Sequence, residues 1–524
     1  MSRAALVLVL VGLTAGVACA GAACSSSSSK SSGGGGGNEG GTTEGGGDGG
    51  AGGFAPTIAC TDSIPSVYAD PGDVSAQAKG AILKCAHDQD ISAADLLAAA
   101  QATDGGTPGY NGKPFTSGAH IYRVLYRTER GDPNNTPGYS SALVLLPDTP
   151  RAGVLPVVVA SHGSRGQAAA CAPSLQSPAA SDVNPDYIHQ VYPLVGFGYA
   201  VIAPDLAGYD APFAAPTNPP STYADSLDVG KSTLDGVAAL RNVLPSASLS
   251  QQVVIVGHSQ GGHTALSALA ISGTYPVSGT IAAVAVYAPL WFSARGYGAL
   301  LLEPASYGFS ESSGGVVSLW YHYTHTLLLD GPDSGFPIFN PATLPILSSF
   351  VNNDCWSASY PDLEEAGTAA NAFFTSAYIN AIDIPATPVG DGNCQGDPTC
   401  TTWIARMTAD WPHLTGAAAK TPILLEYAND DTTITPDLMQ CVLNRLTSDN
   451  AAYNVCYDTS PVGHSGSVSY HSDYVADWIA QQTLGAPAPT ESCGHLEDND
   501  GGVPQIVDVD SGAAIQCNQL VSTQ

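Results

Sequence analysis

Short apolar runs alternate with longer amphipathic stretches along most of the chain. Continuous runs of Val, Ile, Leu and Ala are typical of strands that are covered on both faces. The stretches 223–244 and 262–271 lie between such runs and are expected to be helices. The expected strands are Ile121–Arg127, Ala142–Leu146, Val154–Ala160, Tyr199–Ala203, Val253–Val256, Ile281–Tyr287, Ile423–Tyr427 and Tyr453–Tyr457. This alternation predicts an α/β fold with a mostly parallel central sheet and helices on both faces.

The alternation stops between about Leu290 and Thr421, where the sequence becomes rich in aromatic residues. We interpret residues 291–420 as a cap inserted into the sheet domain, with an independent second domain as the alternative. The aromatic residues are Trp291, Phe292, Tyr297, Tyr307, Phe309, Trp320, Tyr321 and Tyr323. Such side chains either line a substrate pocket or form the core of the cap, and we expect Trp320 to line the pocket.

The first 54 residues have a different composition. A basic start and an apolar run from Ala4 to Ala23 predict a secretory signal peptide over residues 1–23, with a single membrane anchor as the alternative. Residues 24–54 are mostly Ser and Gly and predict a flexible tether. Cys19 and Cys24 both follow small residues, and Cys24 is the better placed for lipidation because the tether follows it. We therefore expect a protein that is secreted or anchored at the cell surface or outer membrane.

The rest of the chain is divided by the insertion. Residues 55–290 and 421–485 are expected to form the two parts of the sheet domain, and residues 486–524 an acidic tail closed by cysteines. Within the tail, residues 498–501 (Asp-Asn-Asp-Gly) lack the remaining ligands of a calcium loop, so we interpret them as a solvated turn.

The cysteines support export. Two of the 12 lie in the export region, which leaves an even ten, and an even number in an exported chain suggests disulfides. Proximity in the sequence favours Cys394–Cys400, Cys441–Cys456 and Cys493–Cys517, and Cys60–Cys85 and Cys171–Cys355 would complete the set.

The charge excludes one class of partner. With 16 Lys and Arg against 46 Asp and Glu, the formal net charge is -30. A chain this acidic repels phosphate backbones, so we expect no nucleic-acid partner.

The motif Gly257-His258-Ser259-Gln260-Gly261 carries the strongest chemical signal. G-x-S-x-G is weak by itself in a chain with 58 glycines. Here four β-branched residues, 253–256, run directly into it, and a helix-like stretch follows. That context predicts a strand-turn-helix elbow that presents Ser259 as a nucleophile at the edge of the sheet.

A serine nucleophile needs a base and an orienting carboxylate. Asp430 and Asp431 follow the strand expected at 423–427, and we favour Asp431 because its spacing to Ile434 fits the usual Asp-x-x-Val/Ile loop. Asp430 remains the alternative acid. His464 follows the last expected strand on a glycine-preceded loop and is the candidate base.

The other histidines are interpreted as structural. His258 and His263 flank the nucleophile and are expected to pack against neighbouring elements, and His471 is expected on a helix. His322 and His325 have the spacing of helical metal ligands, but no third ligand is evident. We therefore expect no metal and no cofactor.

The oxyanion of an acyl-transfer intermediate requires backbone N–H donors. One is expected from Gln260, directly after the nucleophile. The other is expected from the His162-Gly163-Ser164-Arg165-Gly166 loop, which follows the strand at 154–160, with Ser164 as the candidate donor.

Several of these segments together resemble the secretory-lipase family of α/β-hydrolases. They are 162–166 with Cys171-Ala172-Pro173-Ser174, Ala203-Pro204-Asp205-Leu206-Ala207-Gly208-Tyr209, the elbow, the inserted cap and Gly463-His464. The resemblance covers roughly residues 115–480 and implies an α/β-hydrolase fold with a cap-covered site. It also implies action on acyl esters with Ser259, Asp431 and His464 as the triad. The tether, the tail and the long insertion depart from the family and leave the acyl-chain preference open.

The function predicted from the sequence is that of a secreted serine esterase or lipase acting on a small-molecule or lipid ester, with a lipid on Cys24 as a membrane tether. A serine peptidase on the same fold and a surface-tethered binding module without activity are the alternatives. The sequence does not indicate an oligomeric state.

Overall fold

The computed structural model describes residues 54–517 except 103–107, 176–185, 210–218, 292–312, 358–359, 368, 387–393, 395, 459, 491–492, 494, 499–503, 507–512 and 516. The expected signal peptide, Cys19, Cys24 and nearly all of the tether lie outside the described residues, as do Phe292, Tyr297, Tyr307 and Phe309. Within the described residues, no helix combines the length and the apolar character needed to cross a membrane.

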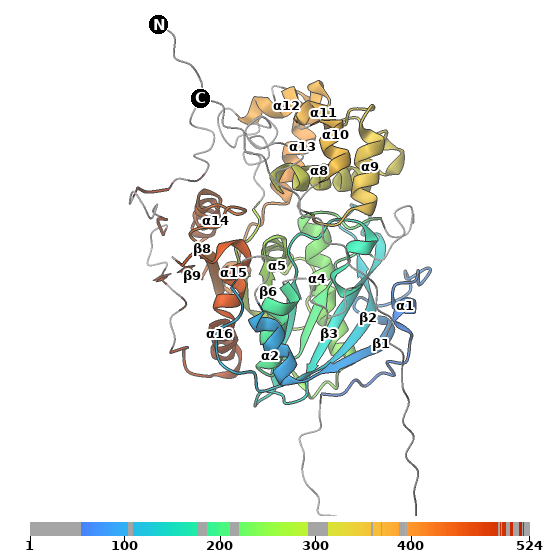
Figure 1. Ribbon diagram of the computed structural model, residues 1–524. Helices are drawn as coiled ribbons and strands as arrows, with labels where there is room; N and C mark the ends of the chain where they lie inside the picture. The colour runs from blue at the N-terminus through green and yellow to red at the C-terminus, as the bar shows by residue number, and fades with distance from the viewer. Residues whose placement is uncertain are drawn as a thin grey trace, which may run out of the picture. The chain divides into compact units, whose positions relative to one another are not determined.

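Ten strands of the described chain form one sheet in the order β1-β2-β3-β5-β4-β6-β7-β8-β9-β10 (Figure 1). The strands are β1 (Ile82–Ile91), β2 (Ala119–Glu129), β3 (Pro137–Pro147), β4 (Leu155–Ser161), β5 (Val201–Pro204), β6 (Leu249–His258), β7 (Thr280–Tyr287), β8 (Ile423–Ala428), β9 (Tyr453–Asp458) and β10 (His495–Asp498). The strands from β5 to β9 pair in parallel, whereas β1, β2, β3 and β10 are joined by antiparallel pairings. All eight strands expected from the sequence are present, as β2 to β9, and β1 and β10 are additional.

Two hydrophobic cores cover the two faces of the sheet. Along β6, Val253 and Ile255 belong to one core and Val254 and Val256 to the other, as the alternation of a strand requires. Helices α4, α5 and α14 contribute to the first core, and α2, α3 and α16 to the second. The helices of this domain are α1 (Ile64–Val67), α2 (Ala93–Gln101), α3 (Tyr192–Gly196), α4 (Ser226–Val243), α5 (Gln260–Ile271), α14 (Pro436–Ser448), α15 (Gly463–Tyr470) and α16 (Ser472–Leu484). The predicted α/β arrangement, with helices on both faces, is confirmed.

The chain between β7 and β8 forms a group of helices with a hydrophobic core of its own, and Figure 1 shows these helices gathered together in yellow and orange. They are α8 (Ser313–His325), α9 (Leu344–Asn353), α10 (Pro361–Ala366), α11 (Ala370–Phe373), α12 (Ser376–Ala386) and α13 (Pro398–Ala409). Trp320 is fully buried in this core and stacks on Phe350 with a ring distance of 5.8 Å. The expectation that Trp320 lines a substrate pocket is therefore wrong, because its indole packs inside the insertion.

The described residues also include short helical turns. The 3₁₀ turns are Ala169–Cys171, Pro173–Leu175, Pro332–Ser334 and Ala418–Lys420, and the π-helical turns are Tyr187–Val191 and Thr326–Asp330.

The insertion is attached to the loop that follows β4. Cys355 forms a disulfide with Cys171 and an antiparallel bridge with Gly166. The neighbouring Trp356 donates its backbone N–H to the C=O of Arg165 over 2.9 Å. The covalent link and the backbone contacts hold this part of the insertion against the segment expected to supply an oxyanion donor.

All ten body cysteines form disulfides, but two of the expected pairings are wrong. Cys60–Cys85, Cys171–Cys355 and Cys394–Cys400 are as expected. The remaining pairs are Cys441–Cys517 and Cys456–Cys493, instead of Cys441–Cys456 and Cys493–Cys517. The sheet explains the difference, because Cys441 lies in the core on one face and Cys456 in the core on the other. The tail therefore reaches both faces, and its strand β10 extends the sheet beside β9.

Candidate active site

Ser259 lies at a sharp turn between β6 and α5. Its backbone has φ 54° and ψ -118°, a region that is costly for a residue with a side chain. Its N–H donates to the C=O of Tyr287 over 2.9 Å, which ties the turn to the neighbouring strand. A Cβ on Gly257 would lie 2.0 Å from the C=O oxygen of Gly261, and one on Gly261 would lie 2.1 Å from that of Ser161. The two glycines of the motif are therefore required by the close packing of this elbow.

The buried carboxylate of Asp431 is paired with the partly buried ring of His464. Asp431 follows β8, and its Oδ1 accepts the N–H groups of Thr433 (2.8 Å) and Ile434 (2.9 Å). Its Oδ2 lies 2.7 Å from Nδ1 of His464. Because a carboxylate accepts, the proton lies on Nδ1 and leaves Nε2 of the neutral ring as the basic nitrogen. Burial lowers the pKa of His464, against the opposing hydrogen bond from Asp431.

The two candidate acids make different hydrogen bonds. Asp431 contacts the ring of His464, whereas Oδ1 of Asp430 accepts the backbone N–H of Gly463 over 2.9 Å. His464 is the second residue of α15 and does not lie on a loop as expected. Asp430 therefore holds the start of the helix that carries the histidine, and Asp431 holds the histidine itself.

The loop after β4 lies directly beside Ser259. A Cβ on Gly163 would lie 3.4 Å from Cβ of Ser259. The N–H of Gly163 donates to Asp186 over 2.6 Å, and the hydroxyl of Ser164 lies 2.6 Å from that of Tyr223. The amide of Gly163 is thus already bonded, and the next amide along the loop belongs to Ser164.

Gln260 begins α5, immediately after Ser259, and is fully buried. The first N–H groups of an α-helix have no acceptor within the helix, and the helix dipole makes this end positive. The backbone N–H of Gln260 is therefore suited by its position to bind a developing negative charge.

A second aspartate–histidine pair lies beside the first. Nδ1 of His258 is 2.7 Å from Oδ1 of Asp186, and its Nε2 is 3.2 Å from the C=O of His464. Both partners are acceptors, so both ring nitrogens donate and His258 carries a positive charge. Burial opposes this charge, but Asp186 outweighs burial and raises the pKa of His258. In the same pair, burial would raise the pKa of Asp186, yet His258 brings it down to about 2.

The sequence interpretation missed this pair. His258 does not merely pack against its neighbours, because it links Asp186 to the backbone of His464. Oδ2 of Asp186 also accepts the N–H of Gly163, so one carboxylate orders both the His258 ring and the loop beside Ser259. A histidine inside a buried elbow was the signal that could have pointed to such a partner, although the partner is 72 residues away.

Three other histidines considered in the sequence analysis contact groups outside these two pairs. His471 lies between α15 and α16 and pairs with Asp458 at 3.3 Å, and His263 lies 2.7 Å from the C=O of Asp410. His322 lies 2.7 Å from the C=O of Ser318, one turn earlier on α8. Each of these contacts is structural.

His325 differs from the other histidines because two carboxylates lie near it. Asp410 and Asp225 come from distant parts of the chain, and the three groups could hold a metal ion. The sequence suggested no third ligand because neither aspartate lies near the histidine in the sequence.

Comparison with protein families gives one match. A family model described as the alpha/beta hydrolase family matches residues 158–478, a range that includes Ser259, Asp431 and His464. No curated protein sequence matches this chain significantly.

Solved structures with similar folds include a lipase and an esterase. Lipase A from Candida antarctica, in its closed state, has a TM-score of 0.55 and 16% identity, and the match covers 88% of this chain and 94% of that one. The rice cell wall degrading esterase LipA from Xanthomonas oryzae has the same TM-score and identity, with 78% of this chain and 99% of that one covered. At these identities the likeness establishes the fold alone.

Proposed function

The chain belongs to the alpha/beta hydrolase family, and on that basis we propose that it hydrolyses carboxylic esters through an acyl-enzyme on Ser259. The observation that carries the proposal is the hydrogen-bonded Asp431–His464 pair, which lies within the matched range together with the strained Ser259 at the strand-helix elbow. A nucleophile, an orienting carboxylate and a histidine base, in this order along the chain, are typical of α/β-hydrolases.

In the proposed mechanism, Nε2 of His464 takes the proton of the Ser259 hydroxyl as its oxygen attacks the ester carbonyl. Asp431 holds the Nδ1–H of the ring and stabilises the imidazolium that forms. The tetrahedral intermediate collapses, the alcohol leaves with the proton from His464, and the acyl group remains on Ser259. Water, deprotonated by His464, then releases the acid and restores the serine.

We assign the oxyanion hole to the N–H groups of Gln260 and Ser164. Gln260 supplies the first amide of α5, and Ser164 follows Gly163, whose own N–H is bonded to Asp186. The hydrogen bond between the hydroxyls of Ser164 and Tyr223 holds the loop in place. Because the donors are backbone groups, they need no reorganisation as charge develops on the substrate oxygen.

Asp186 and His258 act as positioning residues in this scheme. His258 donates to the C=O of His464, and Asp186 holds both His258 and Gly163. The pair therefore fixes the base and the oxyanion loop relative to each other. The positive charge on His258 also disfavours protonation of His464, so the base stays neutral at lower pH.

We assign the role of a cap to the helices between β7 and β8. The support is their attachment to the β4 loop through Cys171–Cys355 and through the Trp356–Arg165 backbone bond. Trp356, which is 41% exposed, lies next to that attachment and is our candidate for contact with the acyl or alcohol group. The choice of ester is expected to depend on such exposed residues rather than on the buried core of the cap.

The five disulfides are consistent with an extracellular protein, since disulfides persist in oxidising compartments. The signal peptide over residues 1–23 and the lipid on Cys24 remain our proposal for export and anchoring. Mass spectrometry of the native N-terminus tests both. A processed chain beginning at a lipid-modified Cys24 supports them, and an intact Met1 in an exporting host contradicts them.

The activity is tested with nitrophenyl esters of increasing acyl length and with nitroanilides of the same acyl groups. We expect hydrolysis of at least one ester, with the matching amide cleaved far more slowly. Preferential cleavage of the amides would favour a peptidase. Purified, folded protein that hydrolyses none of the esters would contradict the proposed function.

A further inference from the structure

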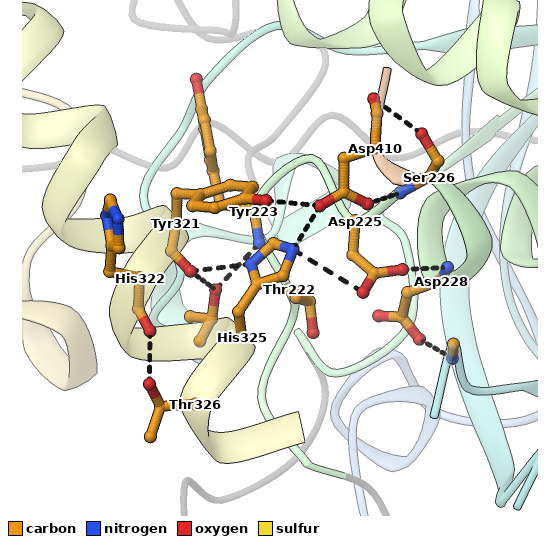
Figure 2. A network of polar contacts seen from close by, with 12 residues as sticks. Thr222, Tyr223, Asp225, Ser226, Asp228, Tyr321, His322, His325, Thr326 and Asp410 are labelled. Carbon is orange, nitrogen blue, oxygen red and sulfur yellow. Dashed lines mark hydrogen bonds and ion pairs between the residues drawn. The ribbon is translucent and has the colours of Figure 1, made fainter. Parts of the chain in front are cut away.

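Three buried side chains converge at a point where the insertion meets the sheet domain (Figure 2). Asp225 is the N-cap residue of α4, His325 is the last residue of α8, and Asp410 directly follows α13. Nε2 of His325 lies 2.8 Å from Oδ2 of Asp410 and 3.7 Å from Oδ2 of Asp225. One ligand atom from each of the three residues lies within 4.8 Å of the others. Their exposed fractions are 5%, 0% and 4%.

We propose that the Asp225–His325–Asp410 cluster binds one Zn²⁺ ion that fastens the insertion to the sheet domain. The ligands are Nε2 of His325 and one carboxylate oxygen from each aspartate. Zn–N and Zn–O bonds of about 2.0–2.2 Å at tetrahedral angles place ligand atoms about 3.3–3.6 Å apart. The observed 2.8 Å and 3.7 Å lie on either side of that range, so small side-chain shifts give the required geometry.

The donor set favours zinc over the common hard cations. Ca²⁺ and Mg²⁺ take oxygen ligands, whereas imidazole nitrogen together with carboxylate oxygen is a usual set for Zn²⁺. Three protein ligands leave one position for water. A cleft of about 460 Å³, lined by all three residues of the cluster, provides space for that water.

Each of the three proposed ligand side chains is oriented by hydrogen bonds to neighbouring residues. Nδ1 of His325 donates to the C=O of Tyr321 over 2.7 Å, and this leaves Nε2 for the metal when the ring is neutral. Oδ1 of Asp410 accepts the N–H of Ser226 (2.8 Å), and its Oδ2 accepts the hydroxyl of Tyr321 (2.6 Å). Oδ1 of Asp225 accepts the N–H of Asp228 (2.9 Å), and its Oδ2 faces His325. Metal-binding histidines and carboxylates are commonly held by such outer hydrogen bonds.

The charges around the cluster also favour the binding of a cation. When both aspartates are ionised they bring two negative charges into a buried site, whereas a proton on His325 supplies only one positive charge. In the absence of an ion, burial and the neighbouring Asp410 raise the pKa of Asp225 to about 7. The nearby cationic side chains have other partners: Arg130 pairs with Asp228 at 2.8 Å, and Lys231 donates to the C=O of Arg130 over 2.7 Å. Buried charges are tolerated when they are paired or bind a metal, and a divalent ion neutralises both carboxylates.

The position of the cluster indicates a structural role. The cleft is lined on one side by the sheet domain and on the other by the insertion, and Ser259, Asp431 and His464 do not line it. The ion would join the start of α4 to the ends of α8 and α13. The backbone C=O of Asp410 also accepts from His263 on α5, the helix that begins after Ser259. Zinc at this site is therefore expected to stabilise the insertion without taking part in the chemistry.

The test measures zinc binding directly on the full chain. The protein is stripped with a chelator, and Zn²⁺ is titrated against a fluorescent zinc chelator of known affinity. We expect one tight site per chain, with affinity lowered by at least about 100-fold in Asp225→Asn and in Asp410→Asn. Asp225→Asn is the milder change, because Asn also caps helices well, and far-UV circular dichroism confirms that each variant is folded.

His120→Gln is the matched control. His120 and His87 both contact Asp90 on an exposed part of the sheet, and this exposed group serves as the control for nonspecific zinc binding. The control should keep the tight site, and so should Ser259→Ala, which separates this inference from the proposed esterase activity. Zinc should also raise the Tm of the parent protein but not that of folded Asp225→Asn. The inference is overturned by the absence of a tight site, by unchanged affinity in folded Asp225→Asn, or by loss of the tight site only in His120→Gln.

Discussion

The imidazole rings of His258 and His464 lie with their centroids 4.6 Å apart, and Nε2 of His258 donates to the C=O of His464. One ring is paired with Asp186 and the other with Asp431, at 2.7 Å in both cases. Asp186 and His258 carry opposite charges, so that pair has no net charge. The imidazole of His464, in contrast, must be neutral if it is to act as a base. The contact between the rings therefore joins a fixed ion pair to the titrating group of the proposed mechanism.

The charge on His258 is expected to set the acid limb of the pH profile. A base is active only when neutral, so kcat/KM falls as the pH drops through the pKa of His464 in the free enzyme. Burial, together with the charge on His258, lowers that pKa, and the inflection should lie below the ordinary 6.5. His258→Gln keeps a hydrogen-bond donor but removes the charge, so the inflection should move to higher pH. The profile of kcat/KM for a nitrophenyl ester measures the shift.

The exposed substitution His120→Gln is the control for this profile, since His120 contacts Asp90 and lies away from both pairs. It should leave the inflection where it is. An inflection that is the same in His258→Gln as in the parent would mean that the charge of His258 does not act on His464.

The two neighbouring aspartates are expected to differ strongly in their effect on rate. Asp431→Ala removes the partner of the His464 ring and should lower kcat by about 10⁴-fold. Asp430→Ala removes one hydrogen bond to the N–H of Gly463, and a bond of this kind corresponds to about 10-fold or less. Steady-state kinetics of the two folded variants provide the comparison, and the reverse ranking would identify Asp430 as the acid.

Much of the fold could be predicted because the parallel strands are covered on both faces and so are continuous apolar runs. Strand β1 was missed because it is only partly buried and its sequence, ILKCAHDQDI, mixes charged with apolar residues. Strand β10 has four residues and depends on pairing with β9, which no local pattern encodes.

The site could be predicted only in part, for a related reason. Ser259 has a local signature, and Asp431 and His464 follow recognisable strands. Asp186 has no such signature, because its role depends on His258, 72 residues further along the chain. The carboxylates near His325 were missed in the same way, since folding brings them together from separate segments.

Two tryptophans of the insertion are expected to separate stability from specificity. Trp320 is fully buried, and Trp320→Ala should destabilise the protein by about 3–5 kcal/mol with little change in ester preference. Trp356 is 41% exposed beside the β4 loop, and Trp356→Ala should change the ratio of kcat/KM between short and long acyl chains at little cost in stability. Denaturant unfolding and the ester series measure the two effects. An unchanged ester profile in Trp356→Ala would exclude that side chain from the substrate site.

The disulfides of the tail give a test of the sheet topology. Because Cys441 and Cys456 lie on opposite faces of the sheet, we expect Cys441 to be linked to Cys517 and Cys456 to Cys493. Peptide mapping of the unreduced protein identifies the linked peptides. A peptide joining Cys441 directly to Cys456 would be incompatible with the described arrangement of α14 and β9.

The central claim is that Ser259 is the residue that carries the acyl group. The most direct measurement is peptide mass spectrometry of the protein after reaction with a fluorophosphonate, with Ser259→Ala and His464→Ala as folded controls. We predict one modified residue, Ser259, with no labelling in Ser259→Ala and much slower labelling in His464→Ala, because the base activates the nucleophile. Modification of a different residue, or rapid labelling of the Ser259→Ala protein, would contradict the account.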